Sequence, residues 1–259
     1  MEPLHIIHPL FEAHILPQGA QIIAFTPRGG APFLWSASLE TFVAGKPFRG
    51  GIPICWPWFG RVRMPAHGFA RTMVWTLVER IETPLEVRLV WQLSDDETTR
   101  AVWDYPFTLR LEMVLSQRLA LTLYVDTLVA TTAALHTYVA VEDVRSATIT
   151  GLGSDYYDAL QGNTFCSDAP TTLVIEGEID RIYPHAHSTT QLQTPQRTLH
   201  IAHQEASDVV VWNPWKKLDD MKQGEQMHML CIESARILTP LQNTDSLGVV
   251  MECETRNEP

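Results

Sequence analysis

The feature that most constrains this fold is a strict alternation of apolar and other side chains between residues 107 and 126. The apolar positions are Phe107, Leu109, Leu111, Met113 and Leu115 in a first run, and Leu119, Leu121, Leu123 and Val125 in a second. A period of two places all apolar side chains of an extended strand on one face. The two runs therefore predict two half-buried strands, joined by a hairpin loop at Ser116–Arg118.

Short strand-like runs occur along the rest of the chain. They are Val87–Leu93, Ala134–Val141, Leu199–Ala202, Val209–Trp212, Met229–Glu233 and Leu247–Glu252. Helix is indicated only briefly, at Ser38–Val43, Asp155–Ala159 and Asp219–Gln223. The 17 prolines and 14 glycines are spread along the chain instead of marking a linker. We therefore expect a single all-β domain spanning residues 1–259, built as a sandwich or barrel.

Charge and composition limit the partners of the chain. Its net charge is -11 at pH 7, whereas a nucleic acid is bound by a basic surface, so no nucleic acid is expected. No stretch approaches the roughly 18 uninterrupted apolar residues of a membrane helix, and residues 1–17 lack the pattern of a signal peptide. The cysteines are scattered without a C-x-x-C motif, at Cys55, Cys166, Cys231 and Cys253. We expect a cytoplasmic protein with reduced thiols and no membrane partner.

The segment Arg49–Gly60 has the most unusual composition. It combines an arginine, paired glycines, two prolines and three aromatic residues in the order R-G-G-I-P-I-C-W-P-W-F-G. Glycine allows a close backbone approach to a ligand, and a guanidinium group matches the geometry of phosphate. The same composition also fits a buried aromatic turn with Arg49 in a structural ion pair. A second candidate segment, Pro65–Arg71, adds His67 and Arg71.

Single ionisable residues interrupt the apolar runs. His136 lies within Ala134–Val141, and Glu233 ends Met229–Glu233. A buried carboxylate requires hydrogen-bond partners, a raised pKa or a solvated cleft, so Glu233 is a candidate functional residue. Taken alone, an isolated strand histidine is more often structural than catalytic, and Asp180 could equally be a turn acid paired with the adjacent Arg181. His185 and His187 form an H-x-H pair, but the surrounding proline, serine and threonines indicate a surface loop and not a metal site.

In order along the chain, a series of short motifs resembles the hexose-6-phosphate mutarotase (glucose-6-phosphate 1-epimerase) branch of the aldose 1-epimerase family. The motifs are Arg49-Gly-Gly-Ile-Pro, Trp56-Pro-Trp-Phe-Gly, His67-Gly-Phe-Ala-Arg71, Leu135-His136-Thr-Tyr, Glu178-Ile-Asp180-Arg-Ile-Tyr183, Val211-Trp-Asn-Pro-Trp215 and Cys231-Ile-Glu233. The resemblance extends from about Gly19 to about Met251. It implies a large antiparallel β-sandwich, or supersandwich, of the galactose-mutarotase type.

The resemblance also implies roles for individual residues. His136 and Glu233 match the catalytic histidine and glutamate of the family, and Arg49, Arg71 and Asp180 match substrate-binding positions. His67, in the same motif as Arg71, is expected to bind a sugar hydroxyl. Anomer exchange needs one general base and one general acid, which glutamate and histidine can supply without a metal or other cofactor.

Three other functions remain open from the sequence. A mutarotase for unphosphorylated aldoses would use Arg49 and Arg71 only structurally. A non-catalytic carbohydrate-binding protein would keep the sandwich without needing His136 and Glu233 as an acid–base pair. A metal-dependent cupin isomerase would require a ligand set that the His185 and His187 pair does not complete. The preferred interpretation is a hexose 6-phosphate substrate, no metal, no cofactor and a monomeric chain.

Overall fold

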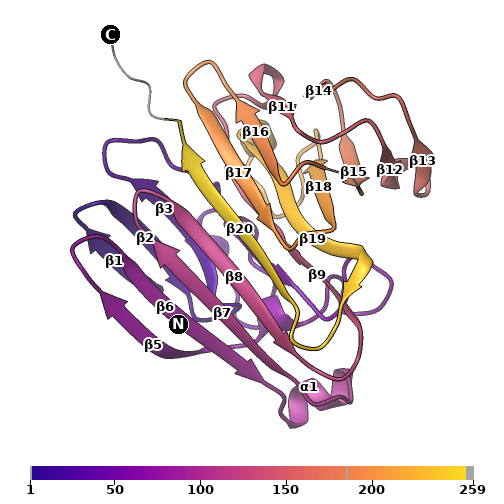
Figure 1. Ribbon diagram of the computed structural model, residues 1–259. Helices are drawn as coiled ribbons and strands as arrows, with labels where there is room; N and C mark the ends of the chain where they lie inside the picture. Colours follow the sequence, from indigo (N-terminus) through magenta and orange to yellow (C-terminus); the bar gives the residue numbers. More distant parts are fainter. Residues whose placement is uncertain (1, 185, 255–259) are drawn as a thin grey trace.

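The computed structural model describes residues 2–184 and 186–254, and its chain forms two large β-sheets that lie face to face (Figure 1). Every pairing between named strands in this part of the chain is antiparallel. Side chains from the inner faces of both sheets share one hydrophobic core, as sandwich packing requires.

The first large sheet has nine strands and contains the alternating runs. In spatial order they are β14 (Thr172–Val174), β11 (Thr148–Thr150), β16 (Thr189–Gln193), β17 (Thr198–Gln204), β20 (Ser246–Cys253), β8 (Leu119–Asp126), β7 (Thr108–Leu115), β6 (Val87–Ser94) and β5 (Thr76–Glu82). Leu109, Leu111 and Leu121 in β7 and β8 are buried, whereas the residues between them are half-buried or exposed. The predicted hairpin is confirmed.

The second large sheet has eight strands. Its spatial order is β13 (Thr164–Cys166), β12 (Tyr156–Asp158), β15 (Ile179–Tyr183), β18 (Asp208–Asn213), β19 (Met229–Leu241), β9 (Thr131–Leu135) and β4 (Ile54–Cys55), with β10 (Tyr138–Ala140) paired to β19. The long strand β19 therefore has partners on both sides. The preceding strand β18 pairs with it on one side, and β9 and β10, from a distant part of the chain, pair with it on the other.

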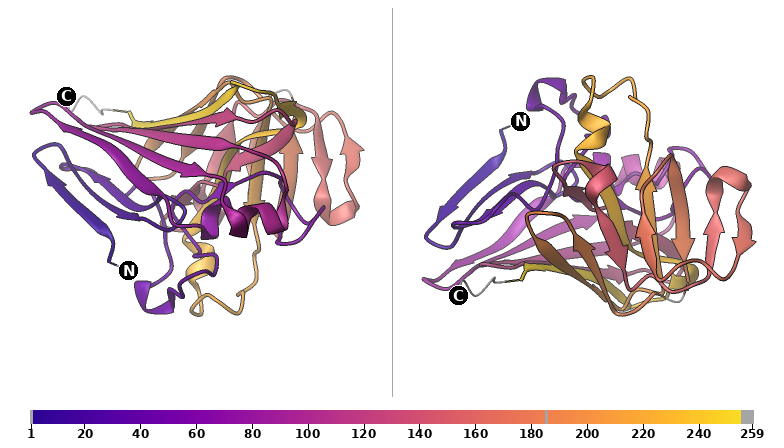
Figure 2. Two further views of the ribbon diagram at one scale, coloured as in Figure 1. Left: turned by 90° about the horizontal axis from the view of Figure 1, so that it is seen from below. Right: turned by 90° about the horizontal axis from the view of Figure 1, so that it is seen from above.

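A smaller sheet at the N-terminus completes the sandwich. It has three strands, β1 (Leu4–His8), β2 (Phe11–Leu16) and β3 (Gln21–Pro27). Figure 2 shows these strands opposite the β5–β8 end of the nine-stranded sheet. Phe11, Ile15 and Phe25 contribute buried side chains to the same core as the large sheets, so this sheet covers the part of the core that the eight-stranded sheet leaves uncovered.

A series of hydrogen bonds between buried polar side chains connects the two large sheets. The ring of His203 in β17 bonds through Nδ1 to the Ser234 hydroxyl of β19 at 2.8 Å, and through Nε2 to the Thr190 hydroxyl of β16 at 3.0 Å. Burial lowers the pKa of His203 to about 4, so its ring is neutral at pH 7. The chain of bonds satisfies three buried polar side chains at once.

Several sequence-based expectations need correction. Ala134–Val141 is interrupted at His136 and Thr137, so it forms two short strands instead of one. Asp155–Ala159 is not a helix, because Tyr156–Asp158 pairs as β12 with strands on both sides. Asp219–Gln223 forms turns, and Ser38–Val43 contains only a three-residue 3₁₀ turn.

The helices that do form are short. Glu97–Val102 forms α1, which sequence analysis missed although Asp96 and Thr99 make a capping box at its start. The 3₁₀ turns are Leu39–Thr41, Ala70–Thr72, Val144–Ser146, Ala159–Gln161 and Glu225–Met227. Among residues 2–184 and 186–254, no helix has the length and apolar character needed to cross a membrane.

Candidate active site

The register of the eight-stranded sheet gathers polar side chains on its outer face. Glu233 pairs with Val210, and Cys231 pairs with both Trp212 and Tyr138. Asp180 in turn pairs with Trp212. Paired residues share a face, and residues two apart on a strand share a face. Asp180, Trp212, Tyr138 and Glu233 therefore project from the same side, opposite the face that packs into the core.

His136 lies at the break between β9 and β10, on the face that Ala134 and Tyr138 share with Glu233. It follows the last residue of β9, and its backbone N–H donates to the carbonyl of Pro53. Beyond the break, Tyr138 starts β10, and its ring stacks on the imidazole with centroids 4.7 Å apart and planes 9° apart. Trp212 contacts the same imidazole edge-on at 6.0 Å. The imidazole is thus fixed between two aromatic rings.

His136 and Glu233 form a close pair. The distance between His136 Nε2 and Glu233 Oε1 is 3.5 Å, and the two side chains are 10% and 1% exposed. His136 Nδ1 and Glu233 Oε2 have no hydrogen-bond partner among the described protein atoms. Buried polar atoms in native proteins are nearly always hydrogen-bonded, so these two atoms are candidates for hydrogen bonds to a polar ligand.

The surroundings move the two pKa values in opposite directions. Burial raises the pKa of Glu233 well above its ordinary value, the Asp180 charge adds to the rise, and Arg71 opposes it. Burial lowers the pKa of His136 well below its ordinary value, and His67, Arg71 and Arg49 lower it further. Both changes disfavour the charged forms, so burial favours a neutral His136 and a protonated Glu233.

Arg49 lies at one side of the pair and is already engaged. Its Nε donates to Asp220 Oδ2 at 2.8 Å, its Nη1 donates to the Tyr138 hydroxyl at 3.1 Å, and its guanidinium lies over the Trp212 ring at 5.8 Å. The structural ion pair considered for Arg49 therefore exists, and it lies beside His136.

Close backbone packing fixes the glycines that follow Arg49. Gly51 has φ of +61°, and a Cβ there would collide with the backbone of Ile22 in β3. The segment is thus pressed against the N-terminal sheet, and the Arg49 side chain is directed from a rigid backbone.

His67 and Arg71 come from the loop that follows. The His67 and His136 rings meet edge to face with centroids 5.9 Å apart. His67 has φ of +62°, an uncommon conformation for a residue with a Cβ, and its N–H donates to the Gly60 carbonyl. Burial, with Arg71 and Arg61, lowers the pKa of His67 to about 4. His67 is therefore a neutral hydrogen-bonding group at pH 7.

Arg71 differs from Arg49 in its partners. Its Nη2 donates to the carbonyl of Ala66 at 2.7 Å, while its buried Nε has no hydrogen-bond partner among the described atoms. The charge of Arg71 nevertheless influences His67, His136 and Glu233. A half-buried guanidinium group without a carboxylate bonded to it is suited to an anionic ligand.

Asp180 is a half-buried acid on the far side of Trp212. Burial raises its pKa to about 6, and Asp158 and Glu178 contribute to the rise. The alternative expectation for this region, a turn with Asp180 beside Arg181, does not describe the structure, because both residues lie in β15. The Arg181 guanidinium instead lies 4.2 Å from the Tyr156 ring centroid.

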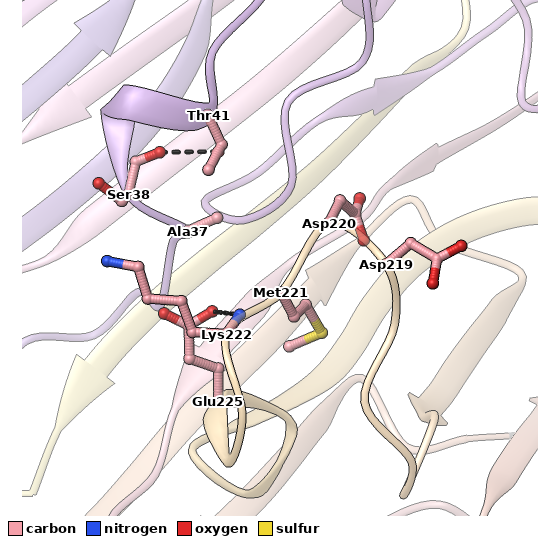
Figure 3. Close-up of a pocket in the computed structure, with 8 residues that line it drawn as sticks. All are labelled: Ala37, Ser38, Thr41, Asp219, Asp220, Met221, Lys222 and Glu225. Atoms are coloured by element: carbon pink, nitrogen blue, oxygen red, sulfur yellow. Dashed lines mark hydrogen bonds between the residues drawn. The ribbon is translucent and has the colours of Figure 1, made fainter.

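A cavity of about 140 Å³ lies next to the site and is bordered by Asp220 (Figure 3). Its lining residues are Ala37, Ser38, Thr41, Asp219, Asp220, Met221, Lys222 and Glu225. In Figure 3 these side chains come from two segments, the 37–41 turn and the 219–225 loop. The cavity therefore lies on the Asp220 side of Arg49 and not over His136 and Glu233.

The structure thus brings together all six residues selected from the sequence, and it adds three that the sequence did not select for a role. Tyr138 and Asp220 hold Arg49, and Cys231 lies between Tyr138 and Trp212 in the sheet. The four cysteines are free, as expected. Burial raises the pKa of Cys55 to about 12, so this thiol is protonated. His185 lies outside the described residues, so the H-x-H pair stays untested.

Comparison with known proteins identifies relatives over most of the chain. The aldose 1-epimerase family model matches residues 3–253. A Salmonella typhimurium protein provisionally named glucose-6-phosphate 1-epimerase is 32% identical over 253 residues, covering 92% of this chain and 84% of the relative. A protein of Haemophilus influenzae with the same provisional name is 34% identical over 219 residues, covering 83% of this chain and 78% of the relative.

Solved structures with the same fold include close and distant relatives. A crystal structure from Salmonella typhimurium, provisionally described as a mutarotase, superposes with a TM-score of 0.94 at 29% identity, covering 97% of this chain and 90% of that one. Galactose 1-epimerase from Lactobacillus acidophilus superposes with a TM-score of 0.76 at 14% identity, covering 97% and 94%. The expected antiparallel β-sandwich of the galactose-mutarotase type is confirmed.

Proposed function

Because this chain belongs to the aldose 1-epimerase family, we propose that it interconverts the α and β anomers of a hexose 6-phosphate. The provisional names of its relatives support a glucose 6-phosphate substrate. His136 and Glu233 are assigned as the catalytic pair, and Arg49, Arg71, Asp180 and His67 as substrate-binding residues.

The carrying observation is the 3.5 Å separation of His136 Nε2 and Glu233 Oε1. Anomer exchange moves protons at two oxygens, the C1 hydroxyl and the ring oxygen, which are bonded to the same carbon. An acid and a base that act on neighbouring oxygens must themselves be neighbours. The pair meets this requirement on a rigid sheet, with its neighbouring rings fixed.

The reaction needs one proton transfer at each oxygen. Glu233 takes the proton from the C1 hydroxyl, the C1–O1 bond becomes a carbonyl, and the bond between C1 and the ring oxygen breaks. The electron pair of that bond stays on the ring oxygen, which takes a proton from His136. After rotation about C1–C2, the hydroxyl adds to the other face of the carbonyl. It returns its proton to His136, while O1 takes one from Glu233.

The proton that the pair holds must be on His136 when the reaction starts. Burial instead favours a protonated Glu233 and a neutral His136. The reaction therefore starts from the less favoured arrangement, in which His136 holds the proton and Glu233 is a carboxylate. A bound dianion would favour it, because it offsets the Arg49 and Arg71 charges that disfavour a charged His136.

Anomer exchange measured by NMR or polarimetry tests the proposal. Fresh α-glucose 6-phosphate and crystalline α-glucose are followed with and without the protein. We expect strong acceleration for the phosphosugar and weak acceleration for glucose. His136→Asn and Glu233→Gln should each reduce the catalysed rate by about 10²- to 10⁴-fold, because each removes one positioned proton-transfer group.

Two outcomes would contradict different parts of the proposal. Full activity of either variant, with an unchanged circular dichroism spectrum, would mean that the catalytic pair is misassigned. No acceleration of either sugar by the unaltered protein would favour a non-catalytic carbohydrate-binding protein.

A second candidate is a mutarotase for unphosphorylated aldoses. It is favoured by one observation, the ion pair between Arg49 and Asp220, which already occupies one proposed phosphate ligand. Equal acceleration of glucose and glucose 6-phosphate would support this second candidate.

A further inference from the structure

Three metal-ligating side chains converge on the hairpin of β1 and β2, at the opposite end of the molecule from β15 and β18 (Figures 1 and 2). His5 in β1 is the direct cross-strand partner of His14 in β2. Glu12 lies two residues before His14 on the same strand, so it shares the face of both histidines. All three side chains are partly solvent-exposed, at 43%, 33% and 56% for His5, His14 and Glu12.

The ligand atoms are spaced as a small metal ion requires. His5 Nε2 lies 2.9 Å from Glu12 Oε1, and His14 Nε2 lies 3.5 Å from the same oxygen. Tetrahedral zinc with bonds of about 2.0–2.1 Å separates its ligand atoms by about 3.3 Å. The two observed distances lie on either side of this value. The His5 and His14 ring centroids are 4.2 Å apart, and one ligand atom from each of the three residues lies within 4.8 Å of the other two.

The chemistry of the donors restricts the ion. Imidazole nitrogen is a ligand of zinc, copper and nickel, whereas magnesium and calcium take oxygen ligands. The Glu12 carboxylate adds an oxygen ligand that zinc also accepts. The net charge of -11 also favours a cation over an anion at the surface.

We infer that His5, Glu12 and His14 form a binding site for a divalent transition-metal ion of the zinc type. The three residues supply one oxygen and two nitrogen ligands, and the fourth position faces solvent. The bound ion would cross-link β1 to β2. Among the described residues β1 is the edge strand of its sheet and pairs with β2 alone, so such a link would hold the edge in place.

Zinc titration by isothermal calorimetry tests this site, with the full chain free of any affinity tag. The variants are His5→Ala/His14→Ala, Glu12→Gln, and His228→Ala as a matched loss of an exposed histidine elsewhere. His136→Asn reports on zinc bound at the candidate active site. We expect one zinc ion per chain in the unaltered protein, loss of that binding in the double variant, and binding weakened about tenfold or more in Glu12→Gln.

A second readout separates binding from misfolding. Cobalt(II) replaces zinc and gives strong visible absorption only when it is four-coordinate, so this band should be present in the unaltered protein and absent in the double variant. Anomer exchange by the double variant in metal-free buffer should equal that of the unaltered protein, which shows that it is folded.

The inference is overturned if the unaltered protein binds no zinc, or if the double variant binds zinc as the unaltered protein does. It is also overturned if zinc binding is lost in His136→Asn and retained in the double variant, because the ion would then belong to the other site. His228→Ala should bind zinc normally.

Discussion

At the scale of single residues, Arg49 and Arg71 differ in what holds them. Asp220 and Tyr138 bond Arg49, whereas the described hydrogen bond of the Arg71 side chain goes to a backbone carbonyl. A phosphate group would therefore compete with Asp220 for Arg49 but meet Arg71 without a competing carboxylate.

We expect Arg71→Ala to reduce kcat/KM for glucose 6-phosphate by about 10- to 100-fold, because a charge-assisted hydrogen bond contributes about 1.5–3 kcal/mol. Arg49→Ala should also affect the phosphosugar far more than glucose. Asp220→Asn is the matched control, since it frees Arg49 and should lower KM for the phosphosugar alone. Equal losses on both sugars in the arginine variants would make these arginines structural.

Asp180 gives a pH-dependent prediction. Its pKa is raised to about 6. The carboxylate, which would accept a hydrogen bond from a sugar hydroxyl, therefore becomes protonated as the pH falls below that value. If it binds substrate, KM should rise about tenfold between pH 7 and pH 5 in the unaltered protein. In Asp180→Asn, KM should be higher at pH 7 and should change less over the same range.

The substrate phosphate also titrates near pH 6 and changes KM equally in the unaltered protein and in Asp180→Asn. The role of Asp180 is therefore tested by the difference between their two KM profiles. Identical KM profiles in the unaltered protein and Asp180→Asn would exclude a substrate role for this carboxylate.

The sequence was sufficient to select the six candidate residues, because short motifs surround each of them. It could not select Asp220, whose loop has no distinctive pattern and meets Arg49 only through the fold. For Glu233, residue order offered a raised pKa only as one of three possibilities, and for His136 it gave no direction, because both pKa values depend on burial between distant strands.

At the scale of elements, the strands that were predicted best are those with a long period-two alternation of apolar side chains. β7 and β8 alternate over eight residues each, and their bounds matched within one residue. β12 has only three residues and was mistaken for helix, because its pairing with β13 and β15 decides its conformation. The break between β9 and β10, where His136 lies, was missed because both halves are apolar.

Gly51 tests how one element positions the site. Gly51→Ala places a Cβ against the backbone of β3, whereas Gly45 has a similar φ of +76° and nothing within 4 Å of its added Cβ. We expect Gly45→Ala to cost about 1–2 kcal/mol from the left-handed backbone alone. Gly51→Ala should cost about 1–3 kcal/mol more from overpacking, measured by urea unfolding.

Gly51→Ala should in addition raise KM for the phosphosugar, because Arg49 lies two residues away. If both variants lose the same stability, the close approach to β3 does not hold this segment in place.

At the scale of the whole molecule, one hydrophobic cluster extends from Ile6 to Met251 and includes side chains from all three sheets. We propose that residues 1–259 form one domain, as the sequence predicted. Differential scanning calorimetry should show a single transition whose calorimetric and van't Hoff enthalpies agree. The unfolding enthalpy should be about 0.7 kcal/mol per residue. Two resolved transitions, or a proteolytic fragment that stays folded, would mean that the chain contains more than one domain.

The position of β19 in the sheet has a consequence for synthesis on the ribosome. β19 lies between β18 and β9 and also carries Glu233, yet it is made after both of these neighbours. Until residue 241 has left the exit tunnel, β9 and β18 each lack a neighbour, and exposed strand edges of this kind favour aggregation. Until β19 is made, a nascent chain would thus lack both the complete eight-stranded sheet and the carboxylate that we propose as catalytic, so one segment supplies both.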